Sequence, residues 1–443
     1  MMKRTLLISC LILVVVAPAR PYQDWIRTGT GLGVERVRLA VPDFQPGPGG
    51  PSGDALRKVF NETLWNDLSN AGIFDIVSRS FYPLAVPGAP AQMRPEAWSN
   101  PPPSAGMVAF GNFGVSSEEA AMQGWLYDVK NPASPLVLGK QYREKATEEN
   151  ARRMAHRFAN EIILRLGGGV PGVAESKIVF ISNRTGHKEV WMMDYDGAGQ
   201  QPLTKLGSIA LSPKLSPDGS RVVFTSYARG AVDLAIYSLE LGRVVSFPRF
   251  AGTNISPAWS ADGMKLAFSS SMRGDPEIFI VDASGANPKR ITAYQGPDLS
   301  PAWNPKTGAQ IAFVSGRSGL PQIYIMDADG TNLQRITDQG YAVSPSWSPN
   351  GQLLAFSWNR KYGPGAPGGQ DVYIMDIASR QWVQLTHGAG NNDSPSWSPD
   401  GRHIVFQSTR SGRTQIWSML ADGTEPRQLT SAGENSQPNW SFK

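Results

Sequence analysis

The sequence predicts two domains: an N-terminal α/β domain, followed by an all-β six-bladed β-propeller closed by the C-terminal strand. Two observations carry this prediction. A Ser-Pro-x-Trp motif recurs through the C-terminal part of the chain at intervals of 44 to 50 residues. The 130 or so residues before it instead mix strand periodicity with helix periodicity. A chain of 443 residues is long enough for both domains to bury their own cores.

Residues 1–19 have the pattern of a signal peptide. Lys3 and Arg4 precede an apolar run at residues 6–16, and a small-x-small cleavage site ends at Ala19. The run is shorter than the roughly 20 residues that a membrane-spanning helix needs. The segment before Cys10 is similar to a lipoprotein cleavage site, but the apolar run continues past this cysteine, so ordinary export is preferred.

The composition of the exported chain argues against nucleic acid as a partner. Without residues 1–19 the chain keeps 40 of its 42 Lys and Arg against 37 Asp and Glu, a net charge of +3. It has no run of clustered Lys and Arg with interleaved aromatic residues. The single cysteine is lost with the signal peptide, so folding does not depend on a disulfide.

The α/β domain is expected to begin with a β-α-β unit. Residues 37–41 and 73–77 are typical of strands, and residues 52–71 between them predict a helix that stops at Gly72. Its apolar face contains Leu56, Phe60, Leu64 and Leu68. The Pro-rich residues 87–103 are predicted to form a loop.

The rest of this domain predicts three strands and a helix. The strands are expected at residues 107–113, 122–128 and 136–144. The helix at residues 147–166 starts at a capping Thr147. It would bury Ala151, Met154, Phe158 and Ile162 against the sheet.

The C-terminal repeat has the dimensions of a propeller blade. Each motif is followed by an apolar strand ending in Phe, an alternating strand, a turn and a short strand, so one repeat contains four strands. The motifs start at Ser212, Ser256, Ser300, Ser344 and Ser394, and six such Phe residues occur, at 180, 224, 268, 313, 356 and 406. The longest interval contains a loop insertion at residues 362–369.

The ends of the repeat region predict how the ring closes. The first copy, residues 177–204, lacks a Trp-bearing strand, and the last residues, 438–443, supply that strand and nothing more. The C-terminal strand is therefore expected to complete the first blade, which leaves no free sheet edge. The predicted organisation is a signal peptide at 1–19, a flexible segment at 20–35, the α/β domain at 36–166, a linker at 167–172 and the propeller at 173–443.

The segments before each Trp strand are predicted to form a ring around one mouth of the channel, where a partner would bind. Loops on a rigid scaffold commonly carry binding residues. The ring members are Thr253, Asn254, Asp298, Tyr341, Ala342, Asn391, Asn392, Asp393, Asn435 and Ser436. Asp298 and Asp393 are acidic and suit a cation or a basic partner residue, but solvated loop carboxylates explain them more simply, so no metal or cofactor is predicted.

An enzyme is the main alternative class. The sequence has no Gly-x-Ser-x-Gly nucleophile motif, and its four histidines, His156, His187, His387 and His403, are too scattered for a metal pattern. Gly29, Gly31 and Gly33 precede the first strand and are better explained as a tether than as a nucleotide loop. A secreted propeller enzyme that cleaves polysaccharide or peptide with channel carboxylates stays open, because such pairs need no fixed spacing.

The order of these parts resembles the TolB family of the Tol-Pal cell-envelope system. The resemblance rests on the signal peptide, on segments 41–44, 125–128 and 153–157, on the Gly-rich linker and on the six blades. It implies a non-enzymatic, monomeric adaptor in the periplasm that supports outer-membrane integrity and cell division. The propeller mouth would bind a Pal-like peptidoglycan-associated lipoprotein, which would hold the protein peripherally at the outer membrane.

The resemblance also implies a second partner, a TolA-like inner-membrane protein. It would bind the N-terminal segment, through Tyr22, Gln23, Asp24, Trp25 and Ile26. The Gly-rich residues 28–33 depart here from the family pattern, so this contact is the least supported part of the resemblance.

Overall fold

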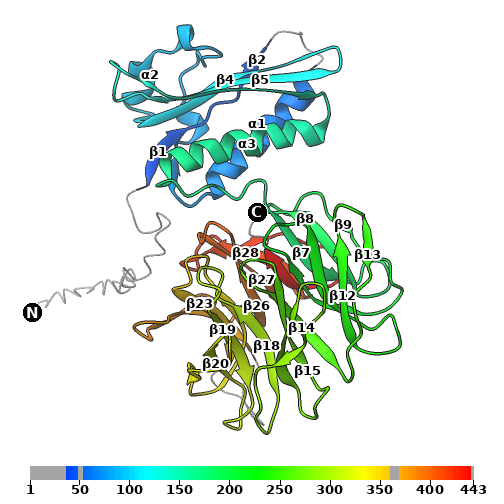
Figure 1. Ribbon diagram of the computed structural model, residues 1–443. Coiled ribbons are helices and arrows are strands. Elements are labelled where there is room, and N and C mark those ends of the chain that lie inside the picture. The colour runs from blue at the N-terminus through cyan, green and yellow to red at the C-terminus, as the bar shows by residue number, and fades with distance from the viewer. Residues whose placement is uncertain (1–35, 48–52, 360–368, 441–443) are drawn as a thin grey trace, which may run out of the picture.

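The computed structural model describes residues 36–47, 53–359 and 369–440. The predicted signal peptide, the segment 20–35 with its five candidate residues, and nearly all of the loop insertion lie outside the described residues. The α/β domain sits above the ring of blades (Figure 1). Among the described residues, no helix is long and apolar enough to cross a membrane.

The α/β domain is a mixed sheet with two long helices packed on one of its faces (Figure 1). The sheet order is β3-β1-β4-β5-β6, and the short β2 pairs with β4. The elements are β1 (Val37–Ala40), β2 (Gln45–Pro46), α1 (Asp54–Asn70), β3 (Phe74–Ile76), β4 (Met107–Ser116), β5 (Glu119–Asp128), β6 (Leu136–Lys145) and α3 (Glu148–Leu166).

The core of this domain follows the predicted apolar faces. Phe60, Leu64 and Leu68 of α1 are buried, as are all four predicted residues of α3, whereas Leu56 is only partly buried. The Thr147 hydroxyl accepts a hydrogen bond from the Asn150 amide at 3.2 Å, which caps the start of α3. The sequence pattern therefore placed both helices correctly.

The Pro-rich segment is not only a loop, in contrast to the prediction. It contains the 3-10 turn η3 (Pro90–Gln92) and the short helix α2 (Pro95–Ser99). Proline opens both, since its fixed φ suits the first helical position. The Trp98 side chain anchors α2 in a small core of its own. Another short turn, η2 (Arg79–Phe81), follows β3.

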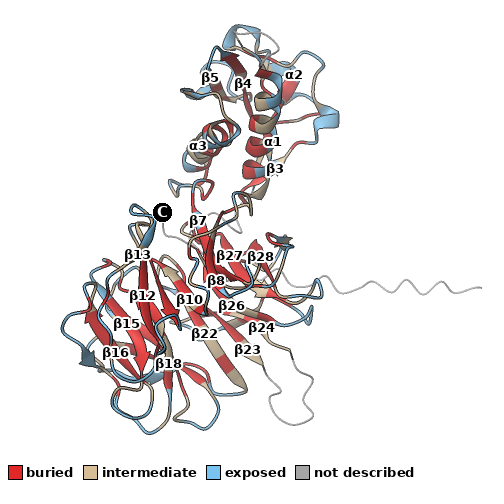
Figure 2. Ribbon diagram, turned by 90° about the vertical axis from the view of Figure 1, so that its right-hand side faces the viewer, coloured by how far each residue is buried: buried red, intermediate tan, exposed pale blue. Residues whose placement is uncertain are grey.

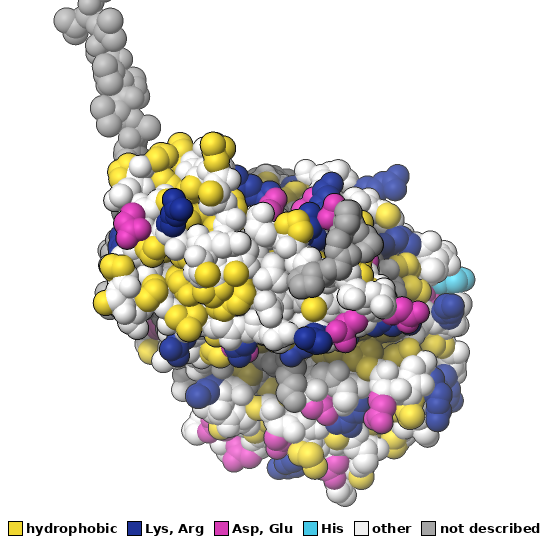
Figure 3. Space-filling model, turned by 90° about the horizontal axis from the view of Figure 1, so that it is seen from above, with side chains coloured by type: hydrophobic (Ala, Val, Ile, Leu, Met, Phe, Trp, Pro, Cys, Tyr) yellow, Lys and Arg dark blue, Asp and Glu magenta, His cyan; other side chains and the backbone are white. Residues whose placement is uncertain are grey.

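The outer end of the α/β domain exposes apolar side chains. Figure 3 looks down on this domain and shows hydrophobic side chains gathered on its upper surface. Phe81 and Leu84 are among the large hydrophobic residues that this domain exposes.

The propeller has six four-stranded antiparallel blades. In sequence order the strands are β7 (Lys177–Ser182), β8 (Glu189–Asp194), β9 (Gln201–Pro202), β10 (Ala210–Leu215), β11 (Arg221–Ser226), β12 (Asp233–Ser238), β13 (Arg243–Val245), β14 (Asn254–Trp259), β15 (Lys265–Ser270), β16 (Glu277–Asp282), β17 (Lys289–Arg290), β18 (Asp298–Trp303), β19 (Gln310–Ser315), β20 (Gln322–Asp327), β21 (Gln334–Arg335), β22 (Tyr341–Trp347), β23 (Leu353–Asn359), β24 (Asp371–Asp376), β25 (Trp382–Gln384), β26 (Asn392–Trp397), β27 (His403–Ser408), β28 (Gln415–Leu420), β29 (Arg427–Gln428) and β30 (Asn435–Trp440).

The ring closes as the sequence predicts. The sheet order β30-β7-β8-β9 shows that the C-terminal strand completes the first blade. The strand with the repeated motif is the first strand of each other sheet, and these inner strands pack against one another around the channel. All six repeated Phe side chains are completely buried, in clusters that join neighbouring blades. Figure 2 shows buried residues along the blade strands, for example along β7, β15 and β27.

Each inner strand carries a β-bulge at its Ser-Pro pair. The register of every inner strand shifts there, and the residue before Pro has a left-handed backbone with φ between 50° and 56°. These residues are Ser212, Ser256, Ser300, Ser344, Ser394 and Gln437. The bulge therefore explains why one motif recurs in every blade.

The Trp of the motif joins neighbouring blades. The indole nitrogens of Trp259, Trp347 and Trp397 donate to backbone carbonyls of the preceding inner strand at 3.0 to 3.1 Å. In β10, where Leu215 replaces Trp, the Leu215 amide instead donates to the Asn439 side chain at 2.9 Å. Hydrogen bonds of this kind fix the spacing between blades around the ring.

Buried polar contacts attach the α/β domain to the ring. Asp67 of α1 accepts a hydrogen bond from the Tyr195 hydroxyl at 2.6 Å and lies 2.7 Å from the His156 ring. On another blade, His403 contacts the Asn70 carbonyl at 2.7 Å, and Arg402 donates to the Gly167 carbonyl at 3.0 Å. These contacts lie at the end of the ring where the inner strands finish, so the α/β domain covers that end.

Candidate binding site

The predicted ring of partner-binding residues lies at the opposite end of the propeller. The inner strand β26 begins at Asn392, and the turn after its end supplies Arg402 and His403 to the α/β domain. The loops that precede the inner strands therefore surround the mouth that faces away from that domain (Figure 1). We call this the free mouth, defined by the segments 252–254, 296–298, 340–342, 390–393 and 433–436.

Three ring members are buried and hold the loops in shape. Asn254, Asn392 and Asn435 are the first residues of their inner strands, and none has an exposed side chain. Each side-chain amide donates to backbone carbonyls of the loop before it, at 2.9 to 3.5 Å. A glycine with positive φ lies two residues earlier in each case, which allows the chain to turn back.

Asp298 occupies the same position in another blade and is also buried. It forms an ion pair with Arg317 at 2.8 Å, and the Arg317 guanidinium lies 4.8 Å from the Tyr294 ring centre and 5.0 Å from that of Tyr324. Burial raises the pKa of Asp298, although Ser315 and Arg317 oppose this shift. The carboxylate is therefore committed to an internal pair and is not displayed to solvent.

The other predicted residues differ in exposure. Thr253 and Asn391 are exposed, Tyr341, Asp393 and Ser436 are half-buried, and Ala342 is buried. Asp393 accepts a hydrogen bond from the Ser344 hydroxyl of the neighbouring blade at 2.9 Å. The structure thus brings the predicted residues to one mouth, while their contact with a partner stays a prediction.

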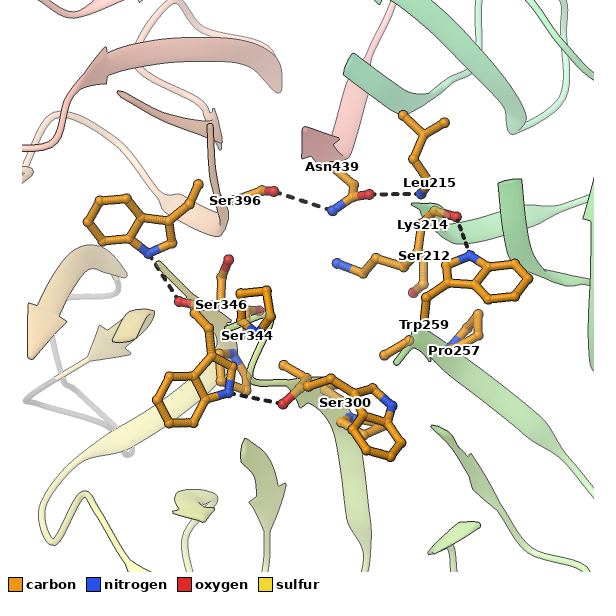
Figure 4. Close-up of a pocket in the computed structure, with 18 of the residues that line it drawn as sticks. Ser212, Lys214, Leu215, Pro257, Trp259, Ser300, Ser344, Ser346, Ser396 and Asn439 are labelled. Atoms are coloured by element: carbon orange, nitrogen blue, oxygen red, sulfur yellow. Dashed lines mark hydrogen bonds between the residues drawn. The ribbon is translucent and has the colours of Figure 1, made fainter. Parts of the chain in front are cut away.

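The channel between the inner strands contains a cavity of about 390 Å³. Its wall repeats the motif: Ser or Gln, then Pro, from all six blades, with the indoles of Trp259, Trp303, Trp347 and Trp397 behind them. Figure 4 shows Ser212, Ser300, Ser344, Ser346 and Ser396 around this space. A volume of a few hundred Å³ suits a small ligand or a few side chains, not a folded domain.

Among the described residues that line this cavity, Lys214 is the only charged one. Its side chain extends from β10 into the open space (Figure 4). Desolvation lowers the pKa of Lys214 to about 8. The sequence analysis did not single out this residue, although it stands at the variable position of the motif, where the other blades have Ala258, Ala302, Ser346, Ser396 and Asn439.

The described residues contain no cluster of three or more His, Cys, Asp or Glu side chains that could hold a metal ion. Of the four histidines, His156 and His403 lie at the junction between the domains. Within the described cavity lining there is no carboxylate, so the pair of acids that a channel glycosidase would need is absent from this wall.

The fold and the cavity define a two-domain propeller protein with a helix-backed α/β domain on one end of the ring and a free mouth at the other. A family model described as the TolB beta propeller domain matches residues 165–366 and 338–443. The chain belongs to the TolB family.

Individual relatives agree with this assignment. The chain is 35% identical over 252 residues to a Tol-Pal system protein TolB of Desulfosudis oleivorans, covering 56% of each chain. It is 40% identical over 135 residues to a TolB homolog of Chlorobium chlorochromatii, covering 30% of each chain. The chain spans about half the length of the first of these relatives.

A solved structure is similar over both domains. The crystal structure of TolB from Acinetobacter baumannii superimposes with a TM-score of 0.78 and 24% sequence identity. The similarity covers 92% of this chain and 97% of that one. It therefore extends the likeness in fold to the α/β domain, which the family model does not reach.

Proposed function

We propose that this protein is a non-enzymatic adaptor of the Tol-Pal system in the periplasm. Its free mouth would bind a Pal-like lipoprotein, and the segment 20–35 would bind a TolA-like protein, in support of outer-membrane integrity and cell division. The observation that carries the proposal is membership of the TolB family, combined with a propeller mouth that the α/β domain leaves open. Relatives with 35% and 32% identity carry the name Tol-Pal system protein TolB.

The chemistry of the free mouth supports a binding role. Its loops are fixed by buried Asn side chains, so they would present Thr253 and Asn391 on a preformed surface. A preformed surface loses less conformational entropy on binding than a flexible one. The cavity behind it offers hydroxyls, prolines and one ammonium group, which suit binding better than acid–base catalysis.

The test is a binding measurement with the soluble domain of the Pal-like lipoprotein from the same organism. Thr253→Arg and Asn391→Arg place a long cation at the free mouth, where each should weaken binding at least about tenfold, or about 1.4 kcal/mol. Thr307→Arg is the matched control, because this exposed threonine lies in the turn that follows β18, at the other end of the ring.

Unchanged binding by both mouth variants would place the contact elsewhere, and the absence of any binding by the wild-type protein would reject the Pal part of the proposal. Deletion of residues 20–35 should abolish capture of the TolA-like protein and leave Pal binding intact. If the shortened chain captures the TolA-like protein as well as the full exported chain does, the proposed contact through residues 20–35 is rejected.

A further inference from the structure

We infer that the propeller channel holds a site for a carboxylate group, with the Lys214 ammonium as its cationic anchor. The inference goes beyond the proposed contact at the free mouth. The ligand would be a small organic acid or an acidic side chain on a segment that enters the channel.

Lys214 differs in size and charge from the residues at the same position in the other blades. Five of the six inner strands carry Ala, Ser or Asn at this position, and only β10 carries a long charged side chain. The small residues leave an open space of about 390 Å³ into which Lys214 extends (Figure 4). A lysine needed only for packing would lie along a wall instead of pointing into a cavity.

The positive charge of Lys214 lacks a partner within the described residues. The Lys214 ammonium has no hydrogen bond or ion pair with any of the described residues, and no carboxylate lies among those that line the cavity. The pKa of Lys214 falls to about 8 through desolvation alone, with no charged neighbour contributing. A desolvated cation without a partner is costly, and an anion supplied from outside would remove that cost.

The surroundings of the Lys214 ammonium favour a carboxylate over other anions. Around the ammonium are serine hydroxyls, which can donate to carboxylate oxygens, and proline and Trp surfaces, which suit a small apolar body. A single lysine balances one negative charge. A phosphate group carries close to two charges at neutral pH and would call for a second cation, which the described lining lacks.

The side chain of Lys214 can be replaced without touching the architecture. The contact that β10 makes with the next blade uses the Lys214 backbone carbonyl, which accepts from Trp259 at 3.1 Å. Lys214→Met keeps the length of the side chain and removes only the charge. We therefore expect this variant to fold and to melt at or above the wild-type temperature.

The experiment measures binding to the full exported chain by calorimetry, with Trp fluorescence as a second readout because four indoles line the cavity. The probes are the monocarboxylate propionate and the peptide Ac-Gly-Asp-Gly-NH2, with propionamide and Ac-Gly-Asn-Gly-NH2 as neutral controls. At fixed ionic strength, one acidic probe should bind with a Kd of about 1 mM or tighter. Binding of propionate alone indicates a small acid, and binding of the peptide indicates an acidic side chain.

Lys214→Met should weaken that binding at least about tenfold, whereas Lys214→Arg and the exposed-lysine control Lys205→Met should retain it. Affinity should also fall as the pH rises through about 8, because the ammonium is lost. Equal binding of the neutral probes, full binding by Lys214→Met, or no binding of either acid would overturn the inference.

A measurement on the wild-type protein alone gives an independent answer. The pKa of Lys214, followed by NMR of its Nζ group, should rise from about 8 when the acidic probe binds. A pKa that stays the same at saturating probe would place the probe outside the channel and contradict the site.

Discussion

The indole nitrogen of Trp440 donates a hydrogen bond to the Ser176 hydroxyl at 2.7 Å, which joins the last described residue to the start of the first blade. The two residues are 264 positions apart. Trp440 is almost completely buried and lies in one cluster with Ile178 and Phe180. The stability of the ring therefore depends on a strand at the very end of the chain.

Removal of this strand should destabilise the whole propeller. Deletion of residues 434–443 exposes the inner edge of β7 and opens the ring, and Trp440→Ala alone should cost about 3–5 kcal/mol of unfolding free energy. Denaturant unfolding checks both. Leu241→Ala is the control, because Leu241 is 56% exposed and its replacement should change stability by less than about 0.5 kcal/mol. A deleted chain that melts at the wild-type temperature would contradict this closure.

The indole hydrogen bonds between blades can be tested with a matched pair of residues. Trp347 donates to the Ala302 carbonyl at 3.0 Å, whereas the buried Trp303 nitrogen has no partner among the described residues. Substitution by Phe removes similar volume at both sites but a hydrogen bond only at Trp347. Trp347→Phe should therefore cost about 1 kcal/mol more than Trp303→Phe in chemical unfolding. Equal costs would show that the indole bond contributes nothing.

The junction between the domains should respond to pH through His156. The His156 imidazole lies against the Asp67 carboxyl group. Its other ionisable neighbours are Arg152, Tyr195 and Asp196. Burial disfavours the charged imidazolium, but the Asp67 carboxylate outweighs it and raises the pKa of His156. Burial likewise raises the pKa of Asp67.

A raised pKa in the folded state means that the stabilising contribution of His156 is complete below its unfolded pKa of about 6.5 and is lost as the pH rises through the folded value. The raised pKa of Asp67 acts with the same sign. We expect the melting temperature of the wild-type protein to exceed that of His156→Gln at about pH 6, with a gap that narrows by about pH 9. Parallel melting curves across this range would exclude the effect.

The sequence was sufficient to predict most helices and strands and the closed propeller. It was not sufficient to predict the side-chain contacts between distant elements. Phe180 and Trp440 could be assigned to one blade because each belongs to a local repeat that is incomplete without the other. Asp67 contacts His156 of its own domain, 89 positions away, and Tyr195 of the propeller, 128 positions away, and no local pattern encodes either contact.

In the candidate site, the sequence likewise did not predict the orientation of single side chains. Sequence spacing placed Asn254 at a channel mouth, but it did not reveal that this side chain turns inward to hold its loop. Lys214 was overlooked because a lysine at a variable position of a repeat is ordinarily a solvated residue. Only the three-dimensional arrangement of six strands shows that this position faces the channel cavity.

The contribution of Asp298 to stability can be measured separately from its predicted contribution to partner binding. Arg317→Ala would leave the buried Asp298 carboxylate without its cation, and such a loss should cost about 3–5 kcal/mol of unfolding free energy. Asp298→Asn keeps the shape and one hydrogen-bond acceptor. Because burial already favours the neutral form of this carboxyl, we expect a loss nearer about 1 kcal/mol.

The combination Asp298→Asn with Arg317→Ala should cost less than the sum of the two single changes, since after Asp298→Asn no buried carboxylate remains to lose its cation. Chemical unfolding of the three variants measures this coupling. A strictly additive result would show that the pair contributes no coupling to stability. An Asp298→Asn protein that unfolds like the wild type yet loses affinity for its partner would show that Asp298 serves the binding surface directly and that its pairing with Arg317 is secondary.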